Sequence, residues 1–304
     1  MSPTRPAGAA PQLPNDSQIF LDHIGWMAPD MARASAALDA LGLTLTPYSV
    51  HAHRDPATDE LKPVGTANRL AMLPTGYLEV LTPVDGASSP VAKHVKACIA
   101  RHVGVHLVAF TVADAEAKAR ALAKSGFTVQ PPVHLRRTIE AADGRKVEVA
   151  FTVVRPAFDH FPEGRVQVLA HHTPDHMWQS RYFPTASPYE ALVEVAYVVD
   201  DPVETAERFA RFLDRPMING ANPVVALDRG RLQFMKRQGA AEMFGARALP
   251  PNPSVAAITL SSRDLMRTRD CFLSSGLHPG SLNADHLLID AAEALGVHLV
   301  VVPA

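Results

Sequence analysis

The chain is poor in cysteine, has no excess of charge of either sign and contains no long hydrophobic run. Its 304 residues include only two cysteines, Cys98 and Cys271, which are far apart and not in CxxC spacing. This usage argues against a disulfide framework or a thiolate zinc site and is typical of a reducing compartment. Lysine and arginine number 29 against 31 for aspartate and glutamate, so the charge balance does not favour nucleic acid as a partner.

No segment approaches the roughly 18 consecutive apolar residues that a membrane helix needs. The first 17 residues are rich in proline and alanine and lack the apolar core of a signal peptide. We therefore expect a disordered tail at 1–17 and a cytoplasmic protein without a membrane partner. The sequence also lacks the GxSxG motif, a phosphate-binding glycine loop and a dinucleotide fingerprint, which disfavours the enzymes that depend on them.

What the sequence does contain is a fourfold repeat. FLDHIGWMAPDMARASAALDALGLTL at 20–45 parallels GVHLVAFTVADAEAKARALAKSGFTV at 104–129, and 191–217 and 254–279 follow the same plan more faintly. Aspartates 30, 114 and 264 each precede a glycine by 12 positions. Each repeat reads as a strand, a helix that begins at aspartate and ends at glycine or aspartate, and two or three further strands.

Such a βαβββ module covers only one face of a small sheet, so the modules must pair to bury a core. The sequence predicts an α+β fold of four modules in two domains. Modules 18–86 and 103–178 make an amino-terminal domain at 18–180, which includes a hairpin that turns at Asp143 and Gly144. Modules 189–238 and 253–304 make a carboxy-terminal domain at 188–304, after an irregular, proline-containing segment.

The motifs LDHIG on the first strand, GTANRLAML on the third and GYLEVL on the fourth, together with HHTPDHMW near residue 178, resemble the vicinal oxygen chelate superfamily, in its glyoxalase-like branch. The resemblance implies two glyoxalase/bleomycin-resistance/dioxygenase-like domains, in each of which paired modules curl into a cup. It also implies a divalent metal held by inward side chains on the first and fourth strands of each module.

Carried over to this chain, the resemblance implies that His23 and Glu79 are metal ligands. An imidazole and a carboxylate suit Fe, Mn, Zn, Co or Ni, so the pair does not select a metal. Both residues lie in strands of apolar pattern, where a charge such as Glu79 needs a partner. The alternative is that His23 only satisfies a hydrogen bond in the core and that Glu79 pairs with Arg69.

The second module departs from the family pattern. Aligning Asp30 with Asp114 places Leu107 opposite His23 and leaves His106 one residue out of phase, so we expect His106 to face away unless a bulge intervenes. Aligning LTP at 81–83 with HTP at 172–174 places Ala170 opposite Glu79.

That alignment predicts that His172 faces the cup and His171 faces outward, with the two exchanged if the register slips. His23, Glu79 and His172 would form a set of two histidines and one carboxylate with open positions. The alternative is a solvated strand end at HHTP.

The matching positions of the carboxy-terminal half are Glu194 or Val195, Gln233, Ala257 and His298. They do not form a ligand set, and we expect that this half has lost the chemistry and supports the first half or an interface.

Other polar residues are candidates for substrate contacts. Asn68 and Arg69 on the third strand, with His51 and His53 on the second, could line the cup. Arg136 with its neighbour Arg137 could pair with a substrate carboxylate. Trp178, with Phe183, is a candidate lid or simply packs the domain boundary. The candidate catalytic bases are His53, His171 and Glu79 itself, and the set of proposed substrate-binding residues is Asn68, Arg69, Arg136 and Trp178.

Taken together, the resemblance implies a metal-dependent isomerase, epimerase or lyase that acts on a small substrate chelated through neighbouring oxygens. The first alternative is a metal-free binding or resistance protein, which Leu107 favours. The second is an extradiol-type ring-cleaving dioxygenase, for which the family places the metal in the carboxy-terminal half, where the ligands are missing. A cup filled by side chains would favour a structural remnant. Four modules remove the need for a partner subunit, and the sequence leaves a homodimer open.

Overall fold

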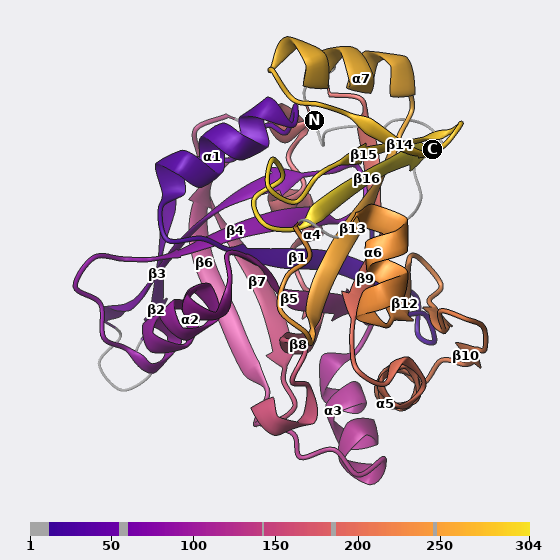
Figure 1. The fold of residues 1–304 in the computed structure, drawn as a ribbon. Coiled ribbons are helices and arrows are strands. Elements are labelled where there is room, and N and C mark those ends of the chain that lie inside the picture. Colours follow the sequence, from indigo (N-terminus) through magenta and orange to yellow (C-terminus); the bar gives the residue numbers. More distant parts are fainter. Residues whose placement is uncertain (1–11, 55–59, 142, 184–186, 246–247) are drawn as a thin grey trace.

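A computed structural model describes residues 12–54, 60–141, 143–183, 187–245 and 248–304 of the protein. These residues form two eight-stranded sheets with helices packed on them (Figure 1). The predicted α+β fold of four modules, paired two by two, is confirmed. None of the described helices is long and apolar enough to cross a membrane.

The first sheet has the strand order β2-β3-β4-β1-β5-β8-β7-β6. Its elements are β1 (Phe20–Met27), α1 (Met31–Ala40), β2 (Ser49–Arg54), β3 (Leu61–Met72), β4 (Tyr77–Pro83), α2 (Pro90–Arg101), β5 (Gly104–Thr111), α3 (Ala115–Lys124), β6 (Val133–Glu140), β7 (Lys146–Val154), the 3-10 turn η1 (Phe158–His160) and β8 (Arg165–His171). The short α4 (Pro174–Met177) and η2 (Ser180–Tyr182) follow.

The second sheet has the order β10-β11-β12-β9-β13-β16-β15-β14. Its elements are β9 (Tyr189–Val198), α5 (Pro202–Leu213), β10 (Met217–Ile218), β11 (Val224–Ala226), β12 (Arg231–Met235), α6 (Arg237–Phe244), β13 (Ser254–Ser262), α7 (Leu265–Ser274), β14 (Gly280–Asn283), β15 (His286–Ile289) and β16 (His298–Pro303).

The repeated aspartates begin the helices, as the sequence predicts. Asp30 accepts a hydrogen bond from the backbone N–H of Arg33 at 2.7 Å, and Asp114 and Asp264 cap α3 and α7 in the same way. A side-chain oxygen at this position satisfies one of the free N–H groups of the first turn. Gly42 follows α1 at φ 76°, a left-handed conformation that ends a helix at little cost only for glycine.

The strand register makes the first sheet curl into a cup. β1 runs parallel to β4 within its module and antiparallel to β5 of the next module. The contact between modules is close, because a Cβ added at Gly25 would lie 2.7 Å from the Cβ of Leu107. The end strands β2 and β6 approach each other, so the concave face is enclosed on both sides. We call this concave face, lined by β1–β8, the cup.

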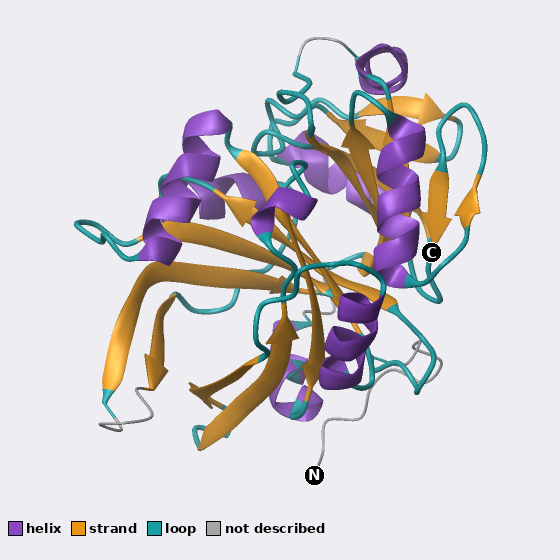
Figure 2. Cartoon of the chain, turned by 90° about the horizontal axis from the view of Figure 1, so that it is seen from below, coloured by secondary structure: helices purple, strands orange, loops and turns teal. Residues whose placement is uncertain are grey.

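One hydrophobic core joins the two halves on the faces opposite the cup, where helices flank the sheets (Figure 2). Helix α2 instead packs on the cup face, against Met27 and Leu81. Polar contacts also cross between the halves. The hydroxyl of Tyr189 donates to the carbonyl of Leu41 at 2.7 Å, and the Trp26 indole N–H donates to the carbonyl of Leu295 at 2.9 Å. The two sheets are therefore buried against each other, and the cup opens away from their contact.

The tail expected to be disordered is only partly within the described residues. Residues 1–11 lie outside them. Gln12 is buried, and its side-chain amide donates to the carbonyl of Pro74. The prediction of disorder is therefore wrong for the described part of the tail near this residue, because its side chain finds a buried partner on the first sheet. The hairpin predicted at Asp143 and Gly144 joins β6 and β7.

The concave face of the second sheet is packed by its own helix. Residues of α6 lie against apolar side chains of β9, β12, β13 and β16, and the ring of Phe244 stacks on His298 at 5.5 Å. His298 is fully buried and accepts a hydrogen bond from the backbone N–H of Ala291. Side chains of the chain itself thus occupy much of the face that corresponds to the cup.

Candidate active site

His23 and Glu79 come from adjacent strands and face the cup. In the parallel pair β1–β4, His23 lies opposite Tyr77, and Gly25 lies opposite Glu79. Alternate residues such as Ile24 and Val80 point into the core on the helix side. The ring of His23 stacks on Tyr77 with centroids 4.3 Å apart, which holds the imidazole against the wall of the cup.

A buried aspartate that the sequence analysis did not single out fixes this histidine. Asp22 is fully buried at a bulge in β1. Its carboxylate lies 2.7 Å from Nδ1 of His23 and 3.1 Å from Nε2 of His171. Burial alone would raise the pKa of Asp22, but the contacts with His171 and His23 hold it well below its usual value. Because an ionised carboxylate only accepts hydrogen bonds, Nδ1 of His23 carries a proton and donates to Asp22. In the neutral form of the ring, Nε2 is then the acceptor.

The structure corrects the predicted register of β8. His171 faces the cup, is buried and contacts Asp22, whereas His172 is exposed and its Nε2 lies 2.8 Å from Oγ1 of Thr152. Ala170 belongs to the core on the helix side. The predicted ligand set of His23, Glu79 and His172 is therefore wrong in its third member.

Strand pairing shows which residue of the second module matches Glu79. Leu107 lies opposite Arg165 and Ala109 opposite Gln167 in β5–β8, as His23 lies opposite Tyr77 and Gly25 opposite Glu79 in β1–β4. Gln167 is thus the counterpart of Glu79, and Leu107 is the counterpart of His23. The four ligand positions of the family carry an imidazole and a carboxylate in one module and a leucine and an amide in the other.

His106 does lie at a bulge, but it does not join the site. The pairing skips this residue between Trp26–Val105 and Gly25–Leu107. Its Nε2 lies 2.8 Å from the carbonyl oxygen of His102, and the two imidazole rings pack at 4.2 Å. Burial lowers the pKa of His106 to about 4, so the ring is neutral near pH 7.

Glu79 is held by neighbours from β2 and β3. The side-chain amide of Asn68 donates to its Oε1 at 2.7 Å. Burial would raise the pKa of Glu79, but His51, His23 and the Asn68 hydrogen bond keep it below its usual value. Arg69 does not pair with it, because the Arg69 guanidinium donates to Ser35 and to the carbonyl of Thr46. The alternative in which Arg69 neutralises Glu79 is therefore wrong.

His51 offers a free nitrogen in the same region. Its Nδ1 lies 3.0 Å from Oγ1 of Thr66, and its buried Nε2 has no partner among the described residues. Burial and then the charge of Arg137 lower the pKa of His51 to about 4. The ring is therefore neutral at pH 7 and can accept a proton. The side chain of His53, a predicted base, lies outside the described residues.

The two neighbouring arginines of β6 point to opposite faces. Arg136 is exposed and pairs with Glu148 at 3.0 Å, whereas Arg137 is partly buried and acts electrostatically on Glu79 and Tyr77. The structure therefore places Arg137, rather than the predicted Arg136, in the cup. Alternation along β6 decides this, since Leu135, two residues before Arg137, packs inside the cup with Ala109.

Trp178 closes one end of the cup by packing. It is 8% exposed and lies edge-on to His171, with ring centroids 4.9 Å apart, and to Tyr77 at 5.9 Å. Met177, Tyr182 and Phe183 pack on the same cluster. The segment after β8 thus shields the Asp22–His23 contact from solvent.

The described residues contain no group of three or more histidine, cysteine, aspartate or glutamate side chains close enough to hold a metal ion. In the second sheet, the positions matching His23, Glu79, Leu107 and Gln167 by strand pairing are Glu194, Gln233, Ala257 and Val300. Glu194 is already bonded to Arg231 and Thr259. The fourth of these positions is Val300 rather than the predicted His298, because His298 pairs with Ala257 as Arg165 pairs with Leu107. Within the described part of the chain, these positions form no group of metal ligands.

Comparisons with known proteins agree with this fold. A family model described as a glyoxalase-like domain matches residues 21–213, which is more than half of the chain. No curated protein matches the sequence.

Among solved structures, a hypothetical protein from Staphylococcus aureus is similar over 94% of this chain and 100% of its own, with a TM-score of 0.64 and 13% identity. A triple mutant of 4-hydroxymandelate synthase from Streptomyces coelicolor is similar over 94% of this chain and 93% of its own, with a TM-score of 0.54 and 14% identity.

A fusion of a xylose isomerase-like TIM barrel with 4-hydroxyphenylpyruvate dioxygenase is similar over 99% of this chain and 52% of its own, with a TM-score of 0.52 and 13% identity. At such identities these structures establish a shared fold. The family match shows that the chain belongs to the glyoxalase-like domain family, within the vicinal oxygen chelate superfamily.

Proposed function

We propose that the cup is the active site of a metal-dependent isomerase, epimerase or lyase that acts on a small oxygenated substrate. The observation that carries the proposal is the hydrogen bond between Asp22 and Nδ1 of His23, beside the ionised carboxylate of Glu79. Metal-ligating histidines usually donate their other N–H to a carboxylate, which fixes the tautomer and the ring orientation. This is the arrangement of Asp22 and His23.

The donor chemistry fits a divalent cation at His23 Nε2 and Glu79. The imidazole is held in the right tautomer, and the carboxylate is charged. Leu107 and Gln167 add at most one amide oxygen, so two protein donors leave most coordination positions for substrate and water. A cation bound there would act as a Lewis acid toward two neighbouring substrate oxygens. We therefore expect the substrate to strengthen metal binding.

The side chains of the cup supply the proton-transfer groups. A general base must come within about 3 Å of the substrate proton. Glu79 is ionised and oriented by Asn68, and Nε2 of the neutral His51 has no partner among the described residues. We assign the base role to these two residues. His171, another candidate, has its Nε2 engaged by Asp22 and is better suited to holding His23 in place.

A metal-free binding protein is the second candidate function. Leu107 and Gln167 occupy two of the four family ligand positions, and Arg137 and Arg165 act electrostatically on Glu79. These positive charges oppose a cation and favour an anionic ligand. A ring-cleaving dioxygenase has less support, because the matching positions of the second sheet, Glu194, Gln233, Ala257 and Val300, do not form a ligand set.

Metal content decides between the two candidates. The full-length, untagged chain is purified and analysed by mass spectrometry beside the variants His23→Ala and Glu79→Ala. The control is Gln233→Ala, which changes the position matching Glu79 in the second sheet. We expect near-stoichiometric metal in the unmodified chain and the control, and its loss in both cup variants. No metal, even after reconstitution with Fe, Mn, Zn, Co or Ni, would overturn the enzyme proposal in favour of the binding protein.

A further inference from the structure

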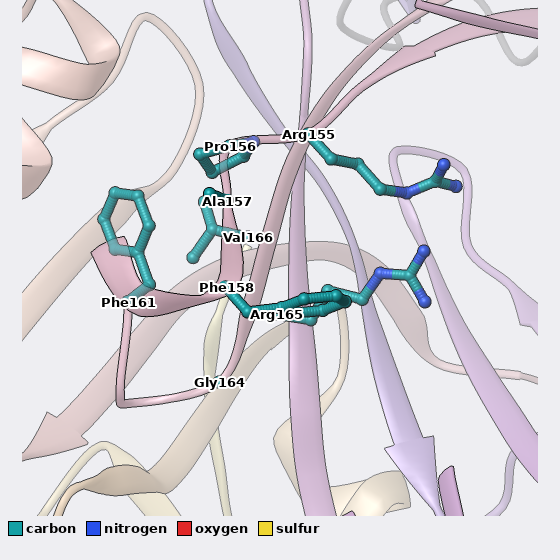
Figure 3. Close-up of a pocket in the computed structure, with 8 residues that line it drawn as sticks. All are labelled: Arg155, Pro156, Ala157, Phe158, Phe161, Gly164, Arg165 and Val166. Carbon is teal, nitrogen blue, oxygen red and sulfur yellow. The ribbon is translucent and has the colours of Figure 1, made fainter. Parts of the chain in front are cut away.

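Three arginines face the cup, and only Arg137 was considered from the sequence. Arg155 follows Val153 on the inward face of β7, and Arg165 begins β8 two residues before Gln167. Figure 3 shows the Arg155 and Arg165 side chains extending in the same direction, with both guanidinium groups directed away from Phe161 and Val166. All three arginines are partly buried.

The described residues do not neutralise this cluster. Arg155 donates only to the neutral side chain of Gln167, at 3.1 Å. Neither Arg137 nor Arg165 forms a hydrogen bond or an ion pair with any described side chain, and Nε of Arg165 is buried without a partner. Glu79 is the carboxylate that acts on all three guanidinium groups. Asp22 is also ionised beside His23. Three positive and two negative charges leave an excess of about one positive charge in the cup.

The crowding has an electrostatic cost. Burial, and then the charges of Arg165 and Arg137, lower the pKa of Arg155 to about 9. Partly buried guanidinium groups rarely lie close together without an acidic or carbonyl acceptor, because like charges repel and each unmade hydrogen bond to a charged group is costly. A cluster of this kind is explained if a bound anion supplies the missing acceptors and charge.

We propose that the cup binds a small organic acid whose carboxylate groups are recognised by Arg155, Arg165 and Arg137. This inference rests on the proposed function, since it names the substrate class of the same site. The carboxylate end of the ligand lies at the arginines, and its remaining oxygens face Glu79 and His23. Paired guanidinium groups match the planar geometry of carboxylates through bidentate hydrogen bonds.

A carboxylate fits the cup better than a phosphate group does. Phosphate sites commonly add backbone N–H groups from a helix N-terminus or a glycine-rich loop. The walls of the cup are strands whose backbone groups pair with neighbouring strands, and the sequence contains no such glycine loop. Side chains must therefore provide the recognition, as the arginines do.

The test measures binding of succinate to the full-length chain by calorimetry at constant ionic strength. Dimethyl succinate is the uncharged probe, and inorganic phosphate is the competing anion. We expect succinate to bind, and Arg165→Met and Arg137→Met each to weaken it about tenfold or more. Arg136→Met, the neighbour on the outer face, is the matched control and leaves the affinity unchanged.

Stability provides an independent readout for the same variants. Because like charges crowd the cup, Arg165→Met should unfold at the same or a higher temperature than the unmodified chain when no anion is present, and it should gain less from added succinate. A less stable Arg165→Met would show that the guanidinium is structural and would overturn the inference. So would equal binding of dimethyl succinate, tighter binding of phosphate, or unchanged succinate affinity in the cup variants.

Failure of the metal proposal and failure of this inference are distinguishable. His23→Ala removes a proposed metal donor and leaves the three arginines in place. If this variant keeps its affinity for succinate and the unmodified chain contains no metal, the anion site is supported and the proposed enzyme function is not. Bound metal without any affinity for succinate would have the opposite meaning and would overturn the inference.

Discussion

Replacement of Asp22 by asparagine removes a buried charge that holds two histidines. The carboxylate lies 2.7 Å from Nδ1 of His23 and 3.1 Å from Nε2 of His171, and it is fully buried. The Asp22→Asn side chain has nearly the same shape and keeps one oxygen acceptor. Its NH₂ group, however, faces one of the imidazole N–H groups, so that two donors oppose each other at this contact.

The magnitude follows from those two contacts. Hydrogen bonds to an ionised acceptor contribute about 1.5–3 kcal/mol each, and roughly half of this remains with a neutral acceptor. Losing the charge at both contacts and leaving one of them mismatched gives a loss of about 3 kcal/mol in the free energy of unfolding at pH 7.

Urea unfolding at pH 7 measures this loss in a double-mutant cycle with His171→Gln. We expect Asp22→Asn to be non-additive with His171→Gln, with a coupling of about 1–3 kcal/mol. The exposed Asp39→Asn is the control and should change stability by less than about 0.5 kcal/mol. A loss below about 1 kcal/mol for Asp22→Asn, with an additive double mutant, would refute the view that Asp22 holds both rings.

Three further predictions concern the rest of the fold. Glu163 is 2% exposed and accepts two hydrogen bonds from Arg208 of the other half, at 2.8 and 3.0 Å, so Glu163→Gln should lower the free energy of unfolding in urea by about 3–5 kcal/mol. Glu204→Gln, at a more exposed partner of Arg208, should lower it by less than about 1 kcal/mol, and equal losses would contradict this. Burial lowers the pKa of His106 to about 4, against about 6.5 in the unfolded chain, so the unfolded state takes up the proton first and the protein loses stability as the pH drops below 6.5. This group accounts for a loss of about 2 kcal/mol in the free energy of unfolding between pH 6.5 and 5, and a His106→Gln variant whose stability has the same pH dependence as the unmodified chain would contradict this. Phe244→Ala removes a buried ring of α6 and should lower the free energy of unfolding by about 3–5 kcal/mol. The metal content should stay unchanged, and loss of metal would mean that the second sheet takes part in the site.

Much of the fold was predictable because the repeat carries strong local signals. Aspartate before each helix and glycine or aspartate after it satisfy backbone groups that every helix end leaves unpaired. Asp214 illustrates the same rule, since it adopts the left-handed conformation, at φ 55°, where the other modules have glycine. Alternating apolar residues then identified the first strands, and pairing of modules followed from the single face that each can cover.

The site was harder to predict, because a slip of one residue reverses the face of a strand. Aligning LTP with HTP shifted the predicted register of β8 by one residue, so His172 was expected to face the cup and His171 to face away from it. The apolar alternation of Val166, Val168 and Ala170 could have set the register correctly, and it would also have placed Arg165 and Gln167 inward. Arg155 lies just beyond the end of β7, so its orientation could be predicted only by extending the alternation of that strand by one residue.

The bulges at Asp22 in β1 and at His106 in β5 could not be read from the sequence. They bring Asp22 inward beside His23 and leave His106 outside the ladder. A bulge inserts one residue without changing the local composition, so no period-2 pattern reveals it. The Asp22–His23–His171 contact therefore depends on tertiary structure.

The most direct test of a metal site in the cup is an anomalous difference map from crystals of the full-length chain soaked with Co²⁺ and succinate. We expect one strong peak in the cup, about 2.0–2.2 Å from Nε2 of His23 and from a carboxylate oxygen of Glu79, with succinate density reaching Arg155 and Arg165. A map without a peak at His23 and Glu79, or with its only peak elsewhere on the protein, would contradict the proposal that this cup is a metal-dependent active site.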